Sequence, residues 1–387
     1  MDKKLYVSKS FKLILVAFII LGIVAILVGF FTGHTDRSWA SLLLNNFYFL
    51  SVALGALFWM AIQSITQSGW SAAFVRVPQA MVTYLILAFA LWLILFFGLH
   101  DLFPWLGEDA ARDSVLVHKV PYLNVTFLSV RFVVFFILWI LLASRIRRLS
   151  LKEDEFGGLT YFKKIEFNSK VFIFVLGISF IFFPLDWLMS LEPHWYSTLF
   201  SVKYFISAFY HGSAIILAIV IILNKLGYFP FLNKGHLHDF SKYIFMLSIM
   251  WGYMWFVQYL LIWYGNIPEE TAYFFLRRQE GFKILFVSEI FINWLFPFLF
   301  LMWNRMAKNT TALLITVGVL IIGQWVELYN AVFPAVVHHP AIGFIEVGSF
   351  VGFAALFTFV VIQSLSKHPL IPKNHPYLEE SLNEEDE

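Results

Sequence analysis

Long uninterrupted runs of apolar residues recur along the chain, and short polar segments separate them. A bilayer core of roughly 30 Å needs about 20 apolar residues in a helix, and the runs have about that length. A β-barrel would instead show alternating segments of about ten residues. The sequence therefore predicts an all-α polytopic membrane protein of about ten transmembrane helices. The predicted spans are Phe11–Phe31, Ala40–Thr66, Gln79–Leu99, Asn124–Ser144, Val171–Met189, Phe200–Leu223, Ser241–Tyr264, Phe282–Trp303, Thr311–Phe333 and Ile342–Ser364.

The composition agrees with a bilayer environment. Hydrophobic residues make up 60% of the chain and charged residues 13%, whereas a soluble domain is about half apolar and a quarter charged. Aromatic residues reach 20%, which is typical of lipid-facing surfaces with interfacial belts. The net charge of +2 gives no sign of a nucleic-acid partner. The first span follows a basic segment but lacks a small-x-small cleavage site, so we interpret it as a retained helix.

The chain contains no cysteine, which removes iron–sulfur ligation, covalent haem attachment, thiol catalysis and disulfides together. A haem held by two histidines would need a second histidine at the depth of His211, and all other histidines fall in loops or near helix ends. We therefore expect no redox centre and no covalently bound cofactor on this chain. Any electron-transfer centre must belong to a partner.

Lysine and arginine gather on one side of the predicted spans, most densely between Arg145 and Lys170. The positive-inside rule then places both termini in the cytoplasm. The acidic tail Glu379–Glu387 is predicted to be disordered. The side that carries the positive charge offers little ionisable chemistry within the spans, only polar groups such as Gln63 and Ser248.

Spans two to five and six to nine can be superimposed as two four-helix sets in the same orientation. The similarity rests on an acid beside tryptophan, Asp186 and Glu327, and on a charge early in the preceding span, Arg131 and Glu289. Parallel repeats of this kind are common in membrane folds, although chance also produces similarity of this strength. The predicted organisation is an N-terminal flanking helix (1–39), two four-helix bundles (40–199 and 200–340), and a C-terminal flanking helix with its acidic tail (341–387).

Ionisable residues inside spans are costly, so each is a candidate for function. They are Arg131, Asp186, His211, Glu289, Glu327 and Glu346. All except His211 fall in the outer third of their predicted helices. One interpretation is a single outer-leaflet cluster that passes protons to the periplasm. The other is a buried pair of Arg131 with one acid that only fixes helix packing. For His211, a proton relay or a hydrogen bond to quinone competes with a neutral ring bonded to a backbone carbonyl.

Two segments resemble a known family. DWLMSLEPHWYSTLF (Asp186–Phe200) and QYLLIWYGNIPEET (Gln258–Thr271) are similar to signatures of the polysulfide-reductase-type membrane subunits of alternative complex III, a bacterial quinol:electron-acceptor oxidoreductase. That complex contains two such subunits, C and F. The stretch Asn45–Trp70, the segment His236–Asp239 and the opening of span four at Tyr122–Asn124 resemble the F subunit more closely. The resemblance covers nearly the whole chain.

The resemblance implies a subunit in the bacterial inner membrane with two four-helix bundles and two flanking helices. It implies a quinone pocket for menaquinone or another quinol, structural lipid, and a role in proton translocation. The implied partners are a multihaem cytochrome c, an iron–sulfur protein, the homologous C-type subunit and a terminal oxidase. Five candidate residues fall in the family motifs: Arg131, Asp186, Glu192, His194 and Glu327. Glu289 and His211 are candidates only because of their depth in the membrane and their chemistry.

An alternative from a different class is a secondary transporter whose acid cluster binds a coupling ion. Transporters often carry broken helices at corresponding positions of two repeats. Pro184 and Pro297 lie in spans five and eight, which do not correspond. The pattern therefore favours the respiratory subunit over the transporter.

Overall fold

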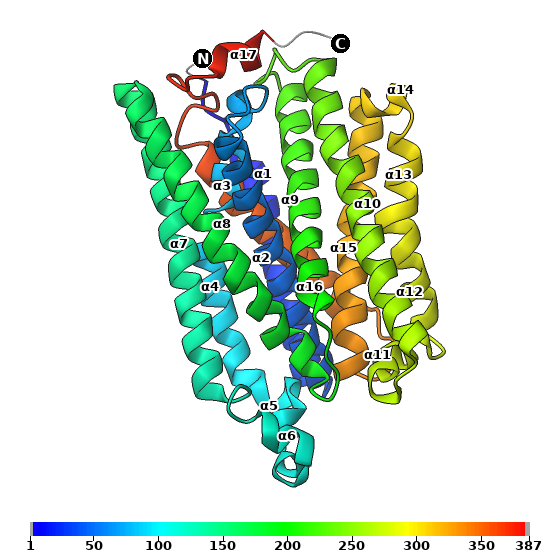
Figure 1. Ribbon diagram of the computed structural model, residues 1–387. Helices are drawn as coiled ribbons and strands as arrows, with labels where there is room; N and C mark the ends of the chain where they lie inside the picture. The colour runs from blue at the N-terminus through cyan, green and yellow to red at the C-terminus, as the bar shows by residue number, and fades with distance from the viewer. Residues whose placement is uncertain (1–2, 384–387) are drawn as a thin grey trace.

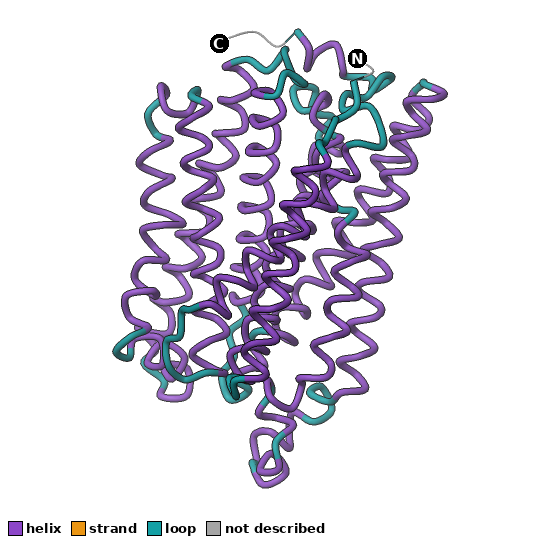
Figure 2. Tube along the Cα trace, turned by 180° about the vertical axis from the view of Figure 1, so that it is seen from behind, coloured by secondary structure: helices purple, strands orange, loops and turns teal. Residues whose placement is uncertain are grey.

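The structure is a computed structural model that describes residues 3–383, and all regular secondary structure in this range is helical (Figures 1 and 2). Within this range ten helical segments are long and apolar enough to cross a membrane. They are α1 (Lys9–Phe31), α2 (Thr35–Ile65), the segment Ala72–Leu102, α7 (Val125–Phe156), α8 (Leu159–Trp187, continued by a short turn to Leu191), α9 (Leu199–Lys225), α10 (Lys234–Gly265), the segment Phe282–Leu301, α15 (Thr310–Val336) and α16 (Phe344–Leu365). The protein is an all-α polytopic membrane protein, as the hydrophobic pattern predicts.

The helices run between two ends of an elongated bundle. The first and last described residues and α17 (Leu378–Leu382) lie at one end, which we call the terminal end (Figure 1). The short helices α5 (Leu99–Leu102), α6 (Ser114–Lys119) and α11 (Pro268–Arg278) lie at the other, which we call the opposite end (Figure 1). The turn α14 (Asn304–Ala307) lies at the terminal end. The terminal end corresponds to the side on which the sequence gathers its positive charge.

The two helices α7 and α8 extend about three turns past the predicted ends of their spans. The sequence placed these ends at Ser144 and Val171, where the apolar runs stop. An apolar run marks the depth of the bilayer, however, and a helix of polar residues can continue into water. Gly157 and Gly158 form the turn between α7 and α8, with φ angles of 66° and 77°. Residues with a side chain rarely adopt such positive φ angles.

Two spans are interrupted within the bundle. The segment Ala72–Leu102 consists of α3 (Arg76–Met81) and α4 (Tyr84–Leu95) with short turns around them. The segment Phe282–Leu301 consists of α12 (Phe282–Ile290), a π-helical turn (Phe291–Leu295) and α13 (Phe296–Leu301). A π-helical turn changes the backbone bonding and is frequent at functional sites. Here its Asn293 carbonyl accepts a hydrogen bond of 3.1 Å from the Tyr210 hydroxyl.

Glycine allows the central helices to approach closely. A Cβ atom at Gly55 of α2 would lie 1.9 Å from the Ala208 carbonyl oxygen of α9, and one at Gly212 would lie 2.8 Å from the Gly55 carbonyl carbon. The flanking helices α1 and α16 meet in the same way at Gly22 and Gly352. Small residues at such crossings are a common means of packing helices in a membrane.

The two central helices have equivalent neighbours. α2 packs against α4, α8 and α15, and α9 packs against α10, α15 and α8. The third helix of each set, α7 and α12, packs along the fourth, α8 and α15. This arrangement places the ends of α9, α10, α12 and α15 around one buried region at the opposite end of the bundle.

The predicted disorder of the acidic tail Glu379–Glu387 is wrong for its first residues. Leu378–Leu382 forms α17, and the Ser381 hydroxyl donates to the Trp70 carbonyl at 2.6 Å and accepts from the Ala73 amide at 3.2 Å. The ring of His236 contacts the Ser381 carbonyl at 2.8 Å. Residues 384–387 of the predicted tail lie outside the described residues.

Candidate functional site

The buried lysine Lys203 lies between two glutamates at the opposite end of the bundle. Its Nζ is 3.0 Å from Oε1 of Glu289 on α12 and 3.3 Å from Oε1 of Glu327 on α15. Glu289 and Glu327 are each 1% exposed, and Lys203 is 7% exposed. Three different helices, α9, α12 and α15, therefore bring one cation and two carboxyl groups together in the protein interior.

A chain of hydrogen bonds continues from Glu327 toward the middle of α9. The Ser207 hydroxyl donates to Oε2 of Glu327 at 2.6 Å and lies 3.2 Å from Nδ1 of His211. The same ring nitrogen is 2.7 Å from the Ser207 carbonyl, and Nε2 is 3.4 Å from the side-chain oxygen of Asn293. Both ring nitrogens thus face oxygen atoms, an environment in which a protonated ring donates on both sides.

Two further groups complete the surroundings of the carboxyl groups. The Trp251 indole donates to Oε2 of Glu327 at 3.1 Å, and the Asn330 side-chain amide donates to Oε2 of Glu289 at 2.9 Å. Among the described residues, neither Oε1 of Glu327 nor the side-chain oxygen of Asn330 has a hydrogen-bond partner. We refer to the connected set Lys203, Ser207, His211, Glu289, Glu327 and Asn330 as the Lys203 network.

A small cavity adjoins the Lys203 network. Lys203, Glu289, Glu327 and Asn330 contribute to its wall, and the space of about 10 Å³ suits the centre of one water molecule. Arg277 of α11 also lines it. A cavity of this size accommodates water but not a quinone ring. Its polar lining is the type that holds buried water rather than an apolar ligand.

The charge of the Lys203 network is unbalanced. One ammonium group faces two carboxyl groups, so with both glutamates ionised the site holds one excess negative charge. An uncompensated charge is expensive away from water. One proton shared between Glu289 and Glu327 removes this cost, and water or Ser207 can bring it. The arrangement is therefore suited to binding and passing on a proton.

The helix α11 covers the cavity on the side facing the end of the bundle. Arg277 is 1% exposed and donates to the Asn330 carbonyl at 2.7 Å, and its Nη2 lies 2.7 Å from Oε1 of Glu192. Burial alone lowers the pKa of Arg277, but the Glu192 carboxylate raises it above its ordinary value. The Glu192 side chain is 19% exposed, so this pair connects the covered cavity with the surface.

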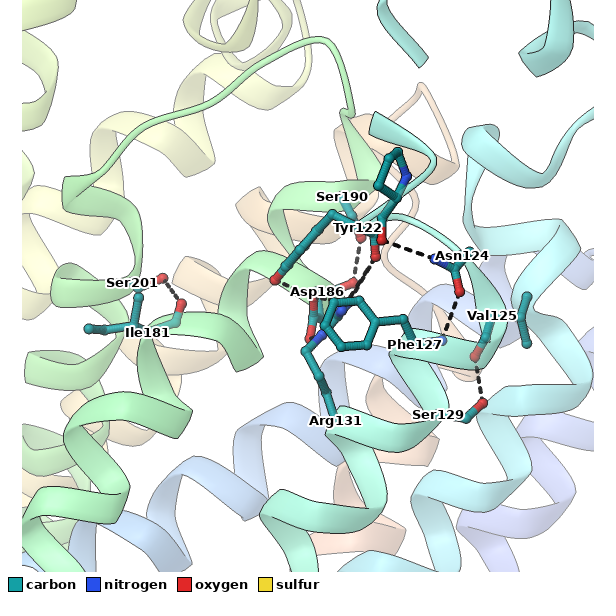
Figure 3. Close-up of polar contacts among 11 residues, drawn as sticks. Tyr122, Asn124, Val125, Phe127, Ser129, Arg131, Ile181, Asp186, Ser190 and Ser201 are labelled. Atoms are coloured by element: carbon teal, nitrogen blue, oxygen red, sulfur yellow. Dashed lines mark hydrogen bonds and ion pairs between the residues drawn. The ribbon is translucent and has the colours of Figure 1, made fainter. Parts of the chain in front are cut away.

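Arg131 and Asp186 form a separate pair on α7 and α8 (Figure 3). Arg131 donates from Nε and Nη2 to the two Asp186 oxygens, each at 2.8 Å, and the Tyr122 hydroxyl donates to Oδ1 at 2.8 Å. The guanidinium carbon lies 4.0 Å from the ring centre of Tyr122 and 4.2 Å from that of Phe127. Every oxygen of Asp186 is satisfied, and charges balance one to one.

The remaining candidates each have their own partner. Glu346 accepts two hydrogen bonds from Arg37, at 2.9 and 2.8 Å, and a third from the Gly343 amide at 2.8 Å. His194 contacts Asp113 at 2.6 Å on the exposed surface, where this ring lowers the pKa of Asp113. The acidic candidates therefore do not form the single cluster with one arginine that the sequence suggested. They form separate ionic groups, and only Glu289, Glu327 and His211 share a network.

The sequence analysis did not identify the basic residues that pair with these acids and so separate them into distinct ionic groups. Lys203, Arg277 and Arg37 lie on the opposite side or at the helix ends that face it, and the hydrophobic pattern does not single them out as ionisable groups inside spans. Lys203 stands in the first turns of α9, where a helix-end cation is ordinary. A signal was present, because Lys203, Ser207 and His211 recur at every fourth residue and so lie on one face of the helix.

The expectation of little ionisable chemistry at the terminal end is also wrong. Arg76 of α3 is 5% exposed and pairs with Asp154 of α7. Its guanidinium group also donates to Gln79 at 2.5 Å and to Ser150 at 3.3 Å, and the adjacent Glu153 is fully buried. The predicted span ends at Ser144, so Glu153 and Asp154 lie outside it, whereas α7 continues to Phe156.

A groove of about 70 Å³ lies between α10 and α11 at the opposite end. Tyr259, Trp263 and Phe274 give it aromatic walls, and Arg278 and Thr271 place polar groups beside them. The Arg278 side chain donates to the Tyr259 hydroxyl at 3.3 Å. The groove therefore combines flat aromatic walls with hydrogen-bond donors.

No protein-family model matches the chain, and a search of curated proteins finds no match either.

Proposed function

We propose that this chain is an integral membrane subunit of a quinol-oxidising respiratory complex of the alternative complex III type, and that its own task is to carry protons. The motifs at Asp186–Phe200 and Gln258–Thr271 support the assignment to this kind of complex. The observation that carries the proton role is the Lys203 network, with two buried carboxyl groups for one cation. Electron transfer is left to haem and iron–sulfur partners.

The order of groups suggests how a proton would travel. His211 lies deepest, Ser207 joins it to Glu327, and Lys203 joins Glu327 to Glu289. A proton on one glutamate frees Lys203 to pair more closely with the other, so the lysine can move charge between them. From Glu289, water in the cavity gives access to Arg277 and Glu192, whose carboxylate reaches the surface.

The place proposed for the quinol is the groove between α10 and α11, because the cavity of the Lys203 network is too small for its ring. Tyr259, Trp263 and Phe274 would hold the flat ring, and Arg278 or Thr271 would bind an oxygen of the head group. Structural lipid is the other occupant that suits this chemistry. The proposed setting is the bacterial inner membrane with both termini in the cytoplasm, which directs the network toward the periplasm.

Purification from native membranes tests the partner assignment. A tagged chain extracted in mild detergent should bring with it a multihaem cytochrome c, an iron–sulfur protein and a homologous membrane subunit, visible by haem spectra and peptide identification. A terminal oxidase should accompany them in larger assemblies. A colourless chain that purifies alone would contradict the assignment to a respiratory complex.

The variant Glu327→Gln tests the proton role. It keeps the shape of the side chain but removes the carboxyl group that Ser207, Trp251 and Lys203 contact. We expect proton release coupled to quinol oxidation to fall at least about tenfold, since loss of a positioned acid or base typically costs that much or more. Glu346→Gln is the matched control, because Glu346 is equally buried but bonded to its own arginine. Equal coupling in the two variants would contradict the proposal.

One observation favours the alternative of a secondary transporter. The π-helical turn Phe291–Leu295 interrupts a span beside the Lys203 network, and transporters bind ions at interrupted helices. The other interrupted span, Ala72–Leu102, is the second helix of its set, whereas the π-helical turn is in the third helix of the other set. The repeats of a transporter would carry interruptions at corresponding positions, and these two interruptions do not correspond. Ion uptake by vesicles that contain the purified chain alone would favour the transporter.

A further inference from the structure

A further buried acid, Glu153, lies at the terminal end, remote from the Lys203 network along the helices. Glu153 of α7 is 0% exposed, and neither of its carboxyl oxygens has a hydrogen-bond partner among residues 3–383. A carboxylate in this state would lack both water and hydrogen bonds, which is one of the most costly conditions for a charged side chain. The neutral, protonated acid avoids this cost.

The neighbouring cation does not neutralise Glu153. Arg76 makes its ion pair with Asp154 and donates to Gln79 and to the hydroxyl and carbonyl of Ser150. Each of its terminal nitrogens is thus engaged by another group. Arg147, the next arginine, donates to Ser364 at 2.8 Å. Neither arginine therefore forms an ion pair or a hydrogen bond with Glu153 in the described part of the chain.

A cavity adjoins the carboxyl group. Glu153, Ser150, Gln79, Ser64 and His375 contribute to its wall, and the space of about 10 Å³ suits the centre of one water molecule. All five of these residues carry hydrogen-bonding side chains that can bind such a water. The acid therefore has a neighbour through which a proton can be exchanged.

The C-terminal segment covers this cavity. The Lys373 amide donates to Oδ1 of Asp154 at 2.9 Å, and the Asn374 side chain donates to the Asp154 carbonyl at 2.9 Å. These bonds place the ring of His375 against Phe162 of α8, with ring centres 5.5 Å apart. Burial, followed by the charge of Arg76, lowers the pKa of His375 to about 4, so the covering ring is neutral at physiological pH.

We propose that Glu153 is a proton-binding site that exchanges its proton with the aqueous phase through the water-sized cavity beneath His375. The facing groups are Arg76, Asp154 and His375, and the first two form an ion pair that does not include Glu153. The site needs no partner protein to exist. Its use as the uptake point of a path toward Glu327 rests on the proposed function above.

Infrared spectroscopy of the purified full chain tests the site without any turnover. A protonated carboxylic acid gives a carbonyl stretch, separate from the amide bands, that shifts when its proton is replaced by deuterium. We expect Glu153→Gln to lose one such band at neutral pH. Glu155→Gln, on the exposed neighbour, should keep it, and so should Glu327→Gln. An unchanged set of acid bands in Glu153→Gln would overturn the proposal.

The route is tested by the rate of deuterium exchange. His375→Ala removes the ring that covers the cavity, and we expect the Glu153 band to exchange several-fold faster than in the unaltered protein. An unchanged rate would overturn the route through the cavity. Should Glu153→Gln fail to fold, Glu153→Asp keeps an acid at this position and should shift the frequency of one acid band, whereas an unchanged set of bands would overturn the site. Unchanged coupling in Glu327→Gln, together with loss of the acid band in Glu153→Gln, would count against the proposed function alone.

Discussion

Two buried ionic groups at the opposite end of the bundle differ in how they compensate charge. In the pair of Arg131 and Asp186, one cation meets one acid, and Tyr122 completes the bonding of the carboxylate (Figure 3). In the Lys203 network, one cation meets Glu289 and Glu327, and a carboxyl oxygen and an amide oxygen lack hydrogen bonds within the described part of the chain. The first group is complete as it stands, whereas the second becomes neutral only when it binds a proton.

This difference in charge compensation distinguishes a packing role from a proton-binding role for acids that have similar positions in the sequence. Asp186 and Glu327 both stand beside tryptophan, late in the fourth helix of their sets, and both are nearly fully buried. A complete pair fixes α7 against α8 but has no free position for a proton. We therefore propose that the Arg131 and Asp186 pair serves helix packing and that the Lys203 network binds the proton.

The largest expected effect is that of Lys203→Met. Without the ammonium group, Glu289 and Glu327 must both bind protons or remain as uncompensated charges, and breaking a buried ion pair costs about 3–5 kcal/mol. We expect a marked loss of folded protein and of thermal stability in detergent, measured by fluorescence-detected size-exclusion after heating. Lys283→Met, at an exposed lysine near the same end, is the control. Equal stability of the two variants would show that Lys203 does not compensate the acids.

A double-mutant cycle at Arg131 and Asp186 is expected to have a smaller net effect. Arg131→Met alone leaves Asp186 uncompensated and should destabilise the fold by about 3 kcal/mol, whereas replacing both residues, as Arg131→Met with Asp186→Leu, should recover most of the loss. Stability is measured as before, and coupled proton release is measured in the same preparations. If the double variant regained stability but not coupling, Asp186 would belong to the proton path and our distinction would be wrong.

Much of the fold was predictable because a bilayer imposes a length and a composition on each helix. The ten spans follow from this constraint, and their centres agree with the structure. The helix ends could not be predicted from the apolar runs, because polar segments such as Arg145–Glu155 continue a helix beyond the apolar run. For this reason the sequence does not predict the buried position of Glu153 or the partly buried position of Asp154.

The pairing of charges was harder to predict than their depth. Depth follows from position along a span, but partners depend on how each helix is rotated and which helix lies beside it. Glu346 thus meets Arg37, 309 positions away along the chain. The periodic spacing of Lys203, Ser207 and His211 was the best sequence signal of a shared polar face, and it extends to Glu289 and Asn293 on α12 and the π-helical turn.

The smallest expected effect is that of Ser207→Ala, which tests whether the Lys203 network works as a chain. The Ser207 hydroxyl lies between His211 and Glu327, and its loss removes the hydrogen-bond contacts with both residues but no charge. Such a bond contributes about 1 kcal/mol to stability, so the fold should persist while coupled proton release slows roughly fivefold. Ser213→Ala is the matched control, because its buried hydroxyl on the same helix bonds only to the Phe209 carbonyl at 2.8 Å. If both variants slowed release equally, the hydroxyl would have no special place between His211 and Glu327, and the proton would have to reach the glutamates through water in the cavity instead.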